Sequence, residues 1–309
     1  MDYFSICAIL KEYRKRAGLS QAALCEGLCE LPTMNKIENG KQNPNKKLLD
    51  ALIQRLQIPL ALNIPVTDSE FEKMQIENKI IDDFSKNRFD ILPLLEQYKS
   101  PSMDKFEEQF YLYAHAVYTY KICNDYPTAL EELYKSIHST FLHYEDGCNV
   151  QQHLFTSIEL SILNSIAICL YKLKKTDTAI AVMEQLALCL ENKYEESDIY
   201  IQKYPMITYN LSTWLGITKQ YEKSLMYSNK GIDCCMKNER YSLLSHLFYN
   251  TGFTLMKMNR RKEGKEYLKK SLALDSIFNK NDSISNSILD IKQSFEKDFL
   301  KELNVYNIF

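Results

Sequence analysis

The chain has 309 residues, a formal net charge of −2, and only eight glycines and eight prolines. Its length exceeds a typical single domain of about 100 to 200 residues, so two or more units are expected. Four of the prolines lie in the first 65 residues, so the remainder is predicted to be rich in helices. The sequence contains no apolar run of about 18 residues and no basic, then apolar, signal segment at its start, which predicts a cytoplasmic protein that does not enter a membrane.

Charge is divided unevenly along the chain. Residues 1–65 contain nine Lys and Arg against six Asp and Glu, a net +3, so the remainder carries −2 − 3 = −5. A weakly basic head on an acidic body favours DNA binding by the head alone. One such head binds weakly, because affinity rises with the number of phosphates neutralised, and the sequence therefore predicts a homodimer.

The sequence offers no enzymatic or metal-binding pattern. It has no G-x-S-x-G, no glycine-rich phosphate loop and no H-E-x-x-H. The nine cysteines are an odd number scattered through apparent helices, and they are interpreted as reduced core residues. We therefore predict a protein that is not an enzyme and that requires neither a cofactor nor a metal.

Two short helices joined by a tight turn are predicted between residues 20 and 41, a layout that lets a helix enter the DNA major groove. The pattern consists of an N-cap, apolar anchors in both helices and a stop signal. These positions are Ser20, Leu24, Leu28, Met34, Ile37 and Asn39-Gly40.

This segment resembles the helix-turn-helix of the phage Cro/repressor family, from Ser20-Gln21 to the Ile37-Glu38-Asn39-Gly40-Lys41 ending. The resemblance implies a phosphate contact from Gln21. It also implies base or backbone contacts from the residues facing outward on the second helix and just after it: Pro32, Thr33, Asn35, Lys36 and Lys41.

Two features depart from that family. The turn around Cys29 lacks the common glycine, and Leu31-Pro32 stand where polar base readers often occur. Apolar contact with a thymine methyl can replace a hydrogen bond there. The alternative interpretation is a helical hairpin that packs and binds nothing.

The body contains a repeated pattern in which two small or modest residues lie twelve positions apart. The pairs are Val117/Ala129, Ala167/Ala179, Ser212/Ser224 and Gly252/Gly264. Two helices of a hairpin cross closely only where side chains are small, so the spacing predicts stacked helical hairpins. The pattern resembles the tetratricopeptide repeat, whose period is about 34 residues, although the copies here are offset by 50, 45 and 40 residues.

The predicted fold is all-α, with a helix-turn-helix domain followed by a tetratricopeptide-like α-solenoid. We expect the DNA-binding domain at 1–62, a linker at 63–69 and the regulatory repeat domain at 70–309. Within the latter, residues 71–98 are predicted to form one further degenerate hairpin. Residues 283–302 are predicted to form a closing helix that caps the stack.

Helical phase predicts which side chains line the concave groove of the solenoid. An asparagine offers both a donor and an acceptor, so a series of them can hold an extended peptide backbone, whereas a single one is usually only solvated. The predicted lining consists of His115, Asn164, Asn210 and Asn250, followed by Tyr118, Lys121, Ile168, Tyr171, Lys172, Thr213, Phe253 and Met256.

As a whole, the sequence resembles the peptide-sensing regulators of Gram-positive bacteria, the RRNPP group, and in particular its PlcR type. The segments that carry the resemblance are 163–167, 209–225 and 247–252, together with the head. The resemblance implies quorum sensing: a homodimer binds a two-fold symmetric operator on double-stranded DNA, and a short signalling peptide binds in the groove.

The resemblance also implies roles for single residues. Asn164, Asn210 and Asn250 are predicted to hold the peptide backbone, and Tyr171 and Phe253 to form side-chain pockets. Lys86 and Arg88 are predicted to hold the peptide's carboxylate. Two alternatives stay open at this point: a peptide-independent dimeric repressor whose repeats only dimerise, and a repeat protein that acts on a protein partner.

Overall fold

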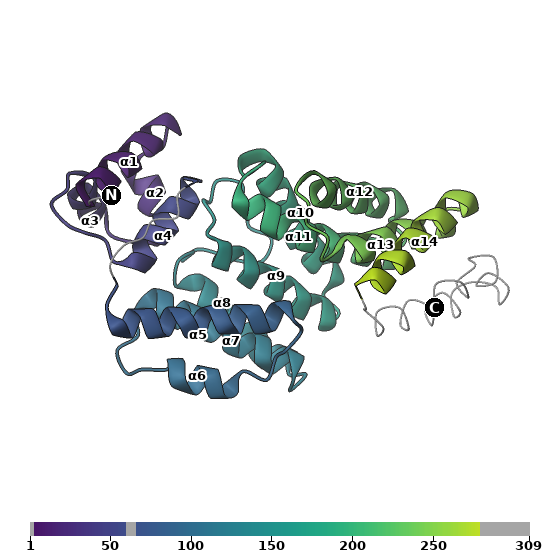
Figure 1. The fold of residues 1–309 in the computed structure, drawn as a ribbon, viewed down its shortest axis with the longest axis horizontal. Helices are drawn as coiled ribbons and strands as arrows, with labels where there is room; N and C mark the ends of the chain where they lie inside the picture. Colours follow the sequence, from purple (N-terminus) through teal and green to yellow (C-terminus); the bar gives the residue numbers. More distant parts are fainter. Residues whose placement is uncertain (1–2, 60–65, 279–309) are drawn as a thin grey trace. The chain divides into compact units, whose positions relative to one another are not determined.

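The computed structural model describes residues 3–59 and 66–278, in which every regular element is a helix (Figure 1). The predicted all-α fold, with a helix-turn-helix and helical repeats, is confirmed. The chain forms two compact units, residues 1–185 and 186–309. The predicted closing helix at 283–302 lies outside the described residues, as does part of the expected linker at 63–69.

The first unit contains the head and the first repeats, and helix α10 crosses into the second unit. The head helices are α1 (Tyr3–Arg16), α2 (Gln21–Cys25), α3 (Leu31–Glu38) and α4 (Lys46–Arg55). The helices that follow in this unit are α5 (Asp68–Ser85), α6 (Leu92–Tyr98), α7 (Lys105–Lys121), α8 (Tyr126–His138), α9 (Ser157–Lys172) and α10 (Thr176–Lys193). The second unit continues with α11 (Asp198–Ile217), α12 (Tyr221–Lys237), α13 (Leu244–Lys257) and α14 (Arg261–Ile277).

The head forms around the anchors predicted from its sequence. Ser20 caps α2 by accepting a hydrogen bond from the Ala23 amide at 3.0 Å. Leu24, Leu28, Met34 and Ile37 are all buried in one core with residues of α1 and α4. The predicted helix-turn-helix is confirmed.

The turn between α2 and α3 does contain a glycine. Gly27 adopts a left-handed conformation with φ of +69°, a region that an L-residue with a side chain rarely enters. The glycine that the sequence lacks at Cys29 is therefore supplied two residues earlier.

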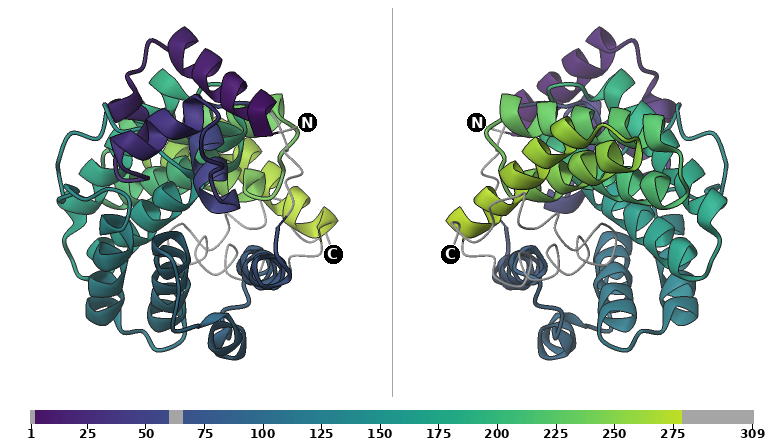
Figure 2. Two further views of the ribbon diagram at one scale, coloured as in Figure 1. Left: turned by 90° about the vertical axis from the view of Figure 1, so that its left-hand side faces the viewer. Right: turned by 90° about the vertical axis from the view of Figure 1, so that its right-hand side faces the viewer.

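The first helices of the early repeats start with the same device. A Thr or Asp accepts a hydrogen bond from the backbone three residues later, and the Glu at that later position bonds back to the cap. These capping boxes are Thr67–Glu70 in α5, Asp104–Glu107 in α7 and Thr156–Glu159 in α9. Figure 2 shows the hairpin of α7 and α8, in dark teal, as two helices side by side.

The small residues mark the points where paired helices cross, as predicted. A Cβ added to Gly252 would lie 2.9 Å from the Gly264 carbonyl oxygen, so α13 and α14 touch through their backbones. In the preceding hairpin the Ser224 hydroxyl donates to the Ser212 carbonyl at 2.7 Å. Larger side chains at these positions would force the helices apart.

Each hairpin also turns at the same place. In every hairpin, a residue with positive φ lies seven positions after the small residue of the first helix, which is residue 117, 167, 212 or 252. This left-handed residue reverses the chain within a few residues, and it is Asn124, Lys174, Lys219 or Asn259. The four copies thus share one turn geometry, although their period exceeds that of the usual repeat.

Candidate functional site

Helix α3 presents the outward face predicted from its sequence. Pro32, Asn35 and Lys36 are exposed and Thr33 is half-buried, whereas the anchors of the helix point into the head core. The side-chain amide of Asn39 donates to the Asn35 side-chain oxygen at 3.1 Å, a bond that does not use the Asn35 amino group. The face combines amide, ammonium and apolar groups, the chemistry used to read base edges in the major groove.

A buried ion pair fixes the C-terminal end of α3. The Arg14 guanidinium on α1 donates to both Glu38 oxygens, at 2.5 and 2.8 Å, and the Glu38 side chain is fully buried. Burial acts to raise the pKa of Glu38, but the hydrogen bonds from Arg14 and Gln21 outweigh it and lower the pKa. The paired charge therefore holds the last turn of α3 against α1 at neutral pH.

Gln21 also contacts the buried ion pair of Arg14 and Glu38. Its side-chain amide donates to the second Glu38 oxygen at 2.7 Å, so one of its N–H groups is used inside the head. Its expected phosphate contact stays a prediction, which the remaining polar atoms of the half-buried side chain would have to make. Lys41 is exposed just beyond α3, with its backbone N–H bonded to the Lys36 carbonyl at 2.8 Å.

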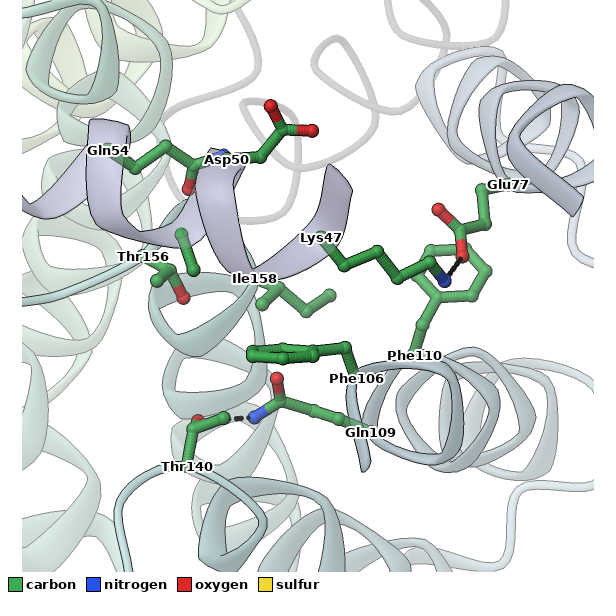
Figure 3. A pocket seen from close by; sticks show the side chains of 11 residues that line it. Lys47, Asp50, Gln54, Glu77, Phe106, Gln109, Phe110, Thr140, Thr156 and Ile158 are labelled. Carbon is green, nitrogen blue, oxygen red and sulfur yellow. Dashed lines mark hydrogen bonds and ion pairs between the residues drawn. The ribbon is translucent and has the colours of Figure 1, made fainter. Parts of the chain in front are cut away.

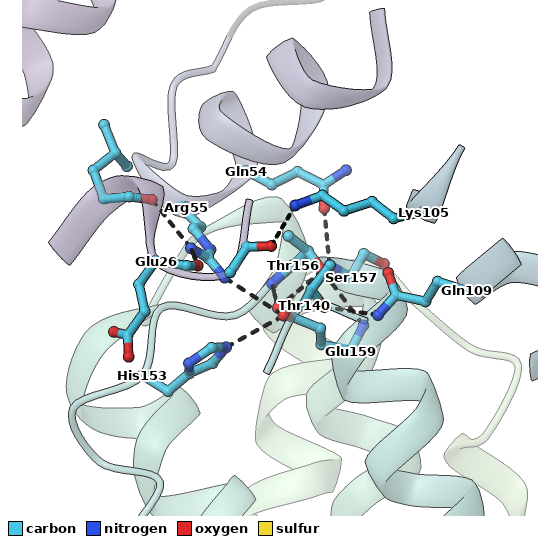
Figure 4. Close-up of polar contacts among 12 residues, drawn as sticks. Glu26, Gln54, Arg55, Lys105, Gln109, Thr140, His153, Thr156, Ser157 and Glu159 are labelled. Atoms are coloured by element: carbon cyan, nitrogen blue, oxygen red, sulfur yellow. Dashed lines mark hydrogen bonds and ion pairs between the residues drawn. The ribbon is translucent and has the colours of Figure 1, made fainter. Parts of the chain in front are cut away.

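Within the first unit, the head is joined to the repeats by Arg55 at the end of α4 (Figure 4). One guanidinium nitrogen donates to the carbonyls of Leu24 and Glu26 in the head, at 3.1 and 2.6 Å. The other faces a Glu159 oxygen on α9 at 3.5 Å, and both side chains are buried. The pair is separated by 104 residues in sequence.

Glu159 is ionised at neutral pH where the head meets α9. Burial acts to raise its pKa, but a hydrogen bond from His153 and the charge of Arg55 lower the pKa to about 2. The His153 ring nitrogen lies 3.3 Å from one carboxylate oxygen, and the Thr156 amide donates to the other at 2.7 Å. The residue thus caps α9 and holds Arg55 with the same side chain.

Two further hydrogen bonds join the head to the repeats within the first unit, at the joint formed by Arg55 and Glu159. The Lys105 ammonium donates to the Gly27 carbonyl at 2.6 Å, and the Ser157 amide donates to the Gln54 side-chain oxygen at 2.8 Å. A Cβ added to Gly27 would lie 1.8 Å from the Thr140 carbonyl oxygen. The turn of the helix-turn-helix therefore fits against the segment after α8 only because it has no side chain.

A cavity of about 180 Å³ lies beside this joint, bordered by α4, α5, α7 and α9 (Figure 3). Phe106, Phe110 and Ile158 give it an apolar lining. Its rim carries the ion pair between Lys47 and Glu77, at 2.5 Å. A cavity of this size is small for a peptide, so it does not replace the groove predicted from the sequence.

The predicted peptide-binding asparagines occupy the first helices of successive repeats. In the first unit, Asn164 lies on α9 and is buried. In the second unit, Asn210 on α11 and Asn250 on α13 are half-buried, and these two helices pack together. The Asn250 amino group donates to the Tyr209 carbonyl at 3.2 Å and to the Thr213 hydroxyl at 2.8 Å. Asn250 therefore already connects α11 and α13.

The other predicted peptide contacts are two half-buried aromatic residues and two basic residues that already pair with aspartates. Tyr171 and Phe253 are half-buried, on α9 and α13. Lys86 and Arg88, predicted to hold a carboxylate, already face acidic residues of α5: Lys86 pairs with Asp82 at 2.6 Å, and Arg88 with Asp83 at 3.5 Å. Their peptide-binding roles stay predictions.

The described residues include no helix long and apolar enough to cross a membrane. Across the same residues, no group of three or more His, Cys, Asp or Glu side chains is arranged to hold a metal. Six of the nine cysteines are buried, and burial raises the pKa of Cys169 and Cys235 to about 12. Such thiols are poor nucleophiles, which fits their interpretation as core residues.

Comparison with known proteins places these features in one family. The RNPP family C-terminal domain matches residues 85–297, more than half of the chain. The chain belongs to the RNPP family. A helix-turn-helix family matches residues 10–63. RNPP-type regulators are DNA-binding transcription factors controlled by signalling peptides, and this RNPP chain is a regulator of that class.

Solved structures share the fold of this RNPP chain at low sequence identity. PlcR from Bacillus thuringiensis, in complex with the peptide PapR7 and DNA, has 22% identity and a TM-score of 0.62, covering 92% of this chain and 98% of its own. Its apo form has 19% identity, a TM-score of 0.58 and coverages of 93% and 99%. ComR from S. thermophilus, in complex with DNA and its signalling peptide ComS, has 15% identity, a TM-score of 0.51 and coverages of 94% and 99%. No curated protein sequence matches significantly.

Sequence reasoning missed the residues that hold the head together and in place. Glu38 belongs to the helix-turn-helix motif, but no pattern in the sequence identifies Arg14 as its partner. No pattern marks Arg55 and Glu159 as a pair. The Thr156-x-x-Glu159 spacing did carry a readable signal, since it is a capping box.

Proposed function

We propose that this RNPP-family chain works in the cytoplasm as a homodimer that reads a two-fold symmetric operator with α3, under control of a short peptide bound by its repeats. The outward face of α3, set on the buried Arg14–Glu38 pair, is the observation that supports the DNA-binding part most directly. A recognition helix must keep its register in the groove while it contacts bases. A buried bidentate ion pair provides that rigidity.

The side chains of α3 suit direct base reading. Asn35 can accept from N6 and donate to N7 on the major-groove edge of an adenine, Lys36 can donate to a guanine, and Pro32 can contact a thymine methyl. We assign Lys41 and Gln21 contacts to the DNA backbone, where they would contribute affinity without sequence preference. Since the head carries only +3, two heads are needed for tight binding at moderate salt.

Peptide binding is assigned to the first helices of the repeats. PlcR has been solved with PapR7 and DNA, and ComR with ComS and DNA, which supports extending both ligand classes to this chain. We assign backbone contacts to Asn164 and Asn210, and the side-chain carbonyl of Asn250 to the same role. Tyr171 in the first unit and Phe253 in the second would each contact an apolar side chain of the peptide.

Helix α9 links the proposed peptide site to the head. Its first turn carries Glu159, which holds Arg55 of the head, and its later turns carry Asn164 and Tyr171. A peptide that binds one position of α9 better than another therefore favours one position of the head. Such a difference in affinity is what a ligand-controlled switch requires.

Selection of duplexes from a random DNA pool by the full-length protein tests this function. We expect two inverted half-sites with centres about 34–36 Å apart, or a multiple, and light scattering should give the mass of a dimer. If all duplexes were retained equally, and the affinity for each fell with salt in the same way, specific base reading by α3 would be refuted. A monomer that binds the selected site as tightly as a dimer would refute the symmetric assembly.

A further inference from the structure

The cavity beside the joint has no part in the functions assigned so far. Its volume is about 180 Å³, whereas an engineered apolar cavity of about 150 Å³ is enough to bind benzene. Helix α4 of the head forms one wall, and α5, α7 and α9 form the others, all within the first unit. The space is therefore large enough for one aromatic ring that carries a small substituent.

The walls of the cavity are apolar and come from both sides of the joint. Ala51 belongs to α4, Phe106 and Phe110 belong to α7, and Ile158 belongs to α9. Phe106 also packs against the core of the head. Phenylalanine rings pack well on the face or edge of another aromatic ring. A flat ligand among these side chains would contact the head and the repeats at the same time.

Gln109 of α7 gives the cavity one polar end. Its side chain is buried, and its amino group donates to the Ser136 carbonyl at 3.0 Å and to the Thr140 hydroxyl at 2.7 Å. Because a backbone carbonyl can only accept, Ser136 fixes the direction of the amide, and the Gln109 oxygen points into the cavity (Figure 3). Within residues 3–59 and 66–278, no group donates to this oxygen. A buried acceptor without a donor is costly, so the cavity favours a ligand with an O–H or N–H group.

The charged groups around the cavity compensate one another. The Lys47 ammonium pairs with Glu77 at 2.5 Å, and Asp50 pairs with Lys46 of its own helix. A charged ligand would lose its hydration here without gaining an unpaired counter-ion. The lining therefore selects a neutral molecule.

We propose that this cavity binds a small, neutral, planar aromatic molecule with one O–H or N–H donor, of about the size of phenol. The donor bonds the Gln109 oxygen, and the ring packs among the phenylalanines. Since the walls come from the head and from the repeats, the ligand binds only while the two are in contact, and it favours that arrangement. This inference goes beyond the proposed function, because it assigns a second class of ligand to a second place in the chain.

Phenol is the probe for the test, and toluene is its control because it has nearly the same shape but no donor. Calorimetric titration of each into the full-length protein at pH 7, without peptide or DNA, measures the two affinities. We expect phenol to bind about twofold to tenfold more tightly than toluene, the value of one hydrogen bond. Phenol at about ten times its Kd should also slow hydrogen exchange at the Ser157 amide about tenfold, because that N–H donates across the joint to Gln54.

Ala51→Leu should block the cavity, because the larger side chain fills space that the ligand needs, and phenol affinity should fall at least tenfold. The matched control is Ala273→Leu, the same substitution at an exposed position of α14, which should bind phenol as the wild type does. Circular dichroism should give both variants the wild-type helix content.

Three results would overturn the proposal, and two of them need only the wild type. These are failure of the wild type to bind phenol and equal affinity for phenol and toluene. The third is binding that is unchanged in Ala51→Leu, which would place the ligand elsewhere. Unchanged exchange at Ser157 in saturating phenol would refute the link between the ligand and the joint. Each of these results leaves peptide and DNA binding by the chain untouched, so the two proposals fail separately.

Discussion

Replacement of Glu159 by glutamine should loosen the head from the repeats while leaving both folded. Glutamine keeps the shape and the capping capacity of the side chain at the third position of α9. It removes the negative charge that faces Arg55 in a fully buried environment. The variant therefore removes the charge and one acceptor oxygen, while the remaining oxygen can still accept from the Thr156 amide and cap α9.

The size of the loss follows from the geometry of the pair. Removing one partner of a buried ion pair costs about 3–5 kcal/mol when the other charge is left without a partner. Arg55 keeps its two carbonyl acceptors in the head, and its contact with Glu159 is long at 3.5 Å, so the loss should be smaller. The lowered pKa of Glu159 has the same sign, but the hydrogen bond from His153 contributes more to it than the charge of Arg55 does. We expect about 2–3 kcal/mol.

Hydrogen exchange at the Ser157 amide measures this loss directly, because that N–H donates across the joint to Gln54. A loss of about 2 kcal/mol should speed its exchange about 30-fold in Glu159→Gln at pH 7. The control is Glu132→Gln, which removes a carboxylate that bonds His115 at 2.9 Å in the same unit. Wild-type exchange at Ser157 in Glu159→Gln, or equal acceleration in the control, would refute the assigned role.

The same pair makes stability depend on pH. Because the pKa of Glu159 is lower in the folded protein, its contribution is present above about pH 4.5 and disappears as the pH falls toward about 2. Thermal unfolding of wild type and Glu159→Gln should therefore differ at pH 7 and converge near pH 2. A constant difference across this range would contradict the low pKa.

Three further outcomes are expected. Lys36→Ala should weaken binding to the selected operator by about 1–3 kcal/mol and relax the preference at one base position, and titrations against operator and scrambled duplexes will check this. Glu38→Gln should destabilise the head by about 3 kcal/mol, because it leaves Arg14 largely buried without an anion, and exchange rates in α1 and α3 will report it. Gly252→Ala should lower the melting temperature, at a cost of about 1–3 kcal/mol, because the new methyl meets the backbone of α14 at 2.9 Å; Gly216→Ala, which meets only the Ser224 hydroxyl at 3.3 Å, should have the smaller effect.

The local features of the fold could be predicted from the sequence. Periodic apolar residues and cap signals located the helices of the head, and the twelve-residue spacing of small residues located the helix crossings. These signals are local because they arise within one helix or one hairpin. Arg55 and Glu159, by contrast, meet across 104 residues, and no local pattern marks such a pair.

The candidate site shows the same limit. Phase correctly put Asn35 and Lys36 on the exposed face of α3, since that depends only on the helix and its core. Phase did not predict that the Asn250 amino group bonds α11 or that Gln21 bonds Glu38. Those contacts depend on the distance and direction of a second helix, which a single sequence does not contain.

The glycine contact at the joint also determines how the head can leave it. Because Gly27 and the Thr140 carbonyl leave no room even for a methyl group, the head cannot slide along the segment after α8 while it stays in contact. It has to separate before it turns, and tightly packed surfaces of this kind exchange between discrete states rather than deform gradually. A ligand that acted at this contact would therefore shift the fraction of molecules whose head is released, and would not change the angle of the head within each molecule by degrees.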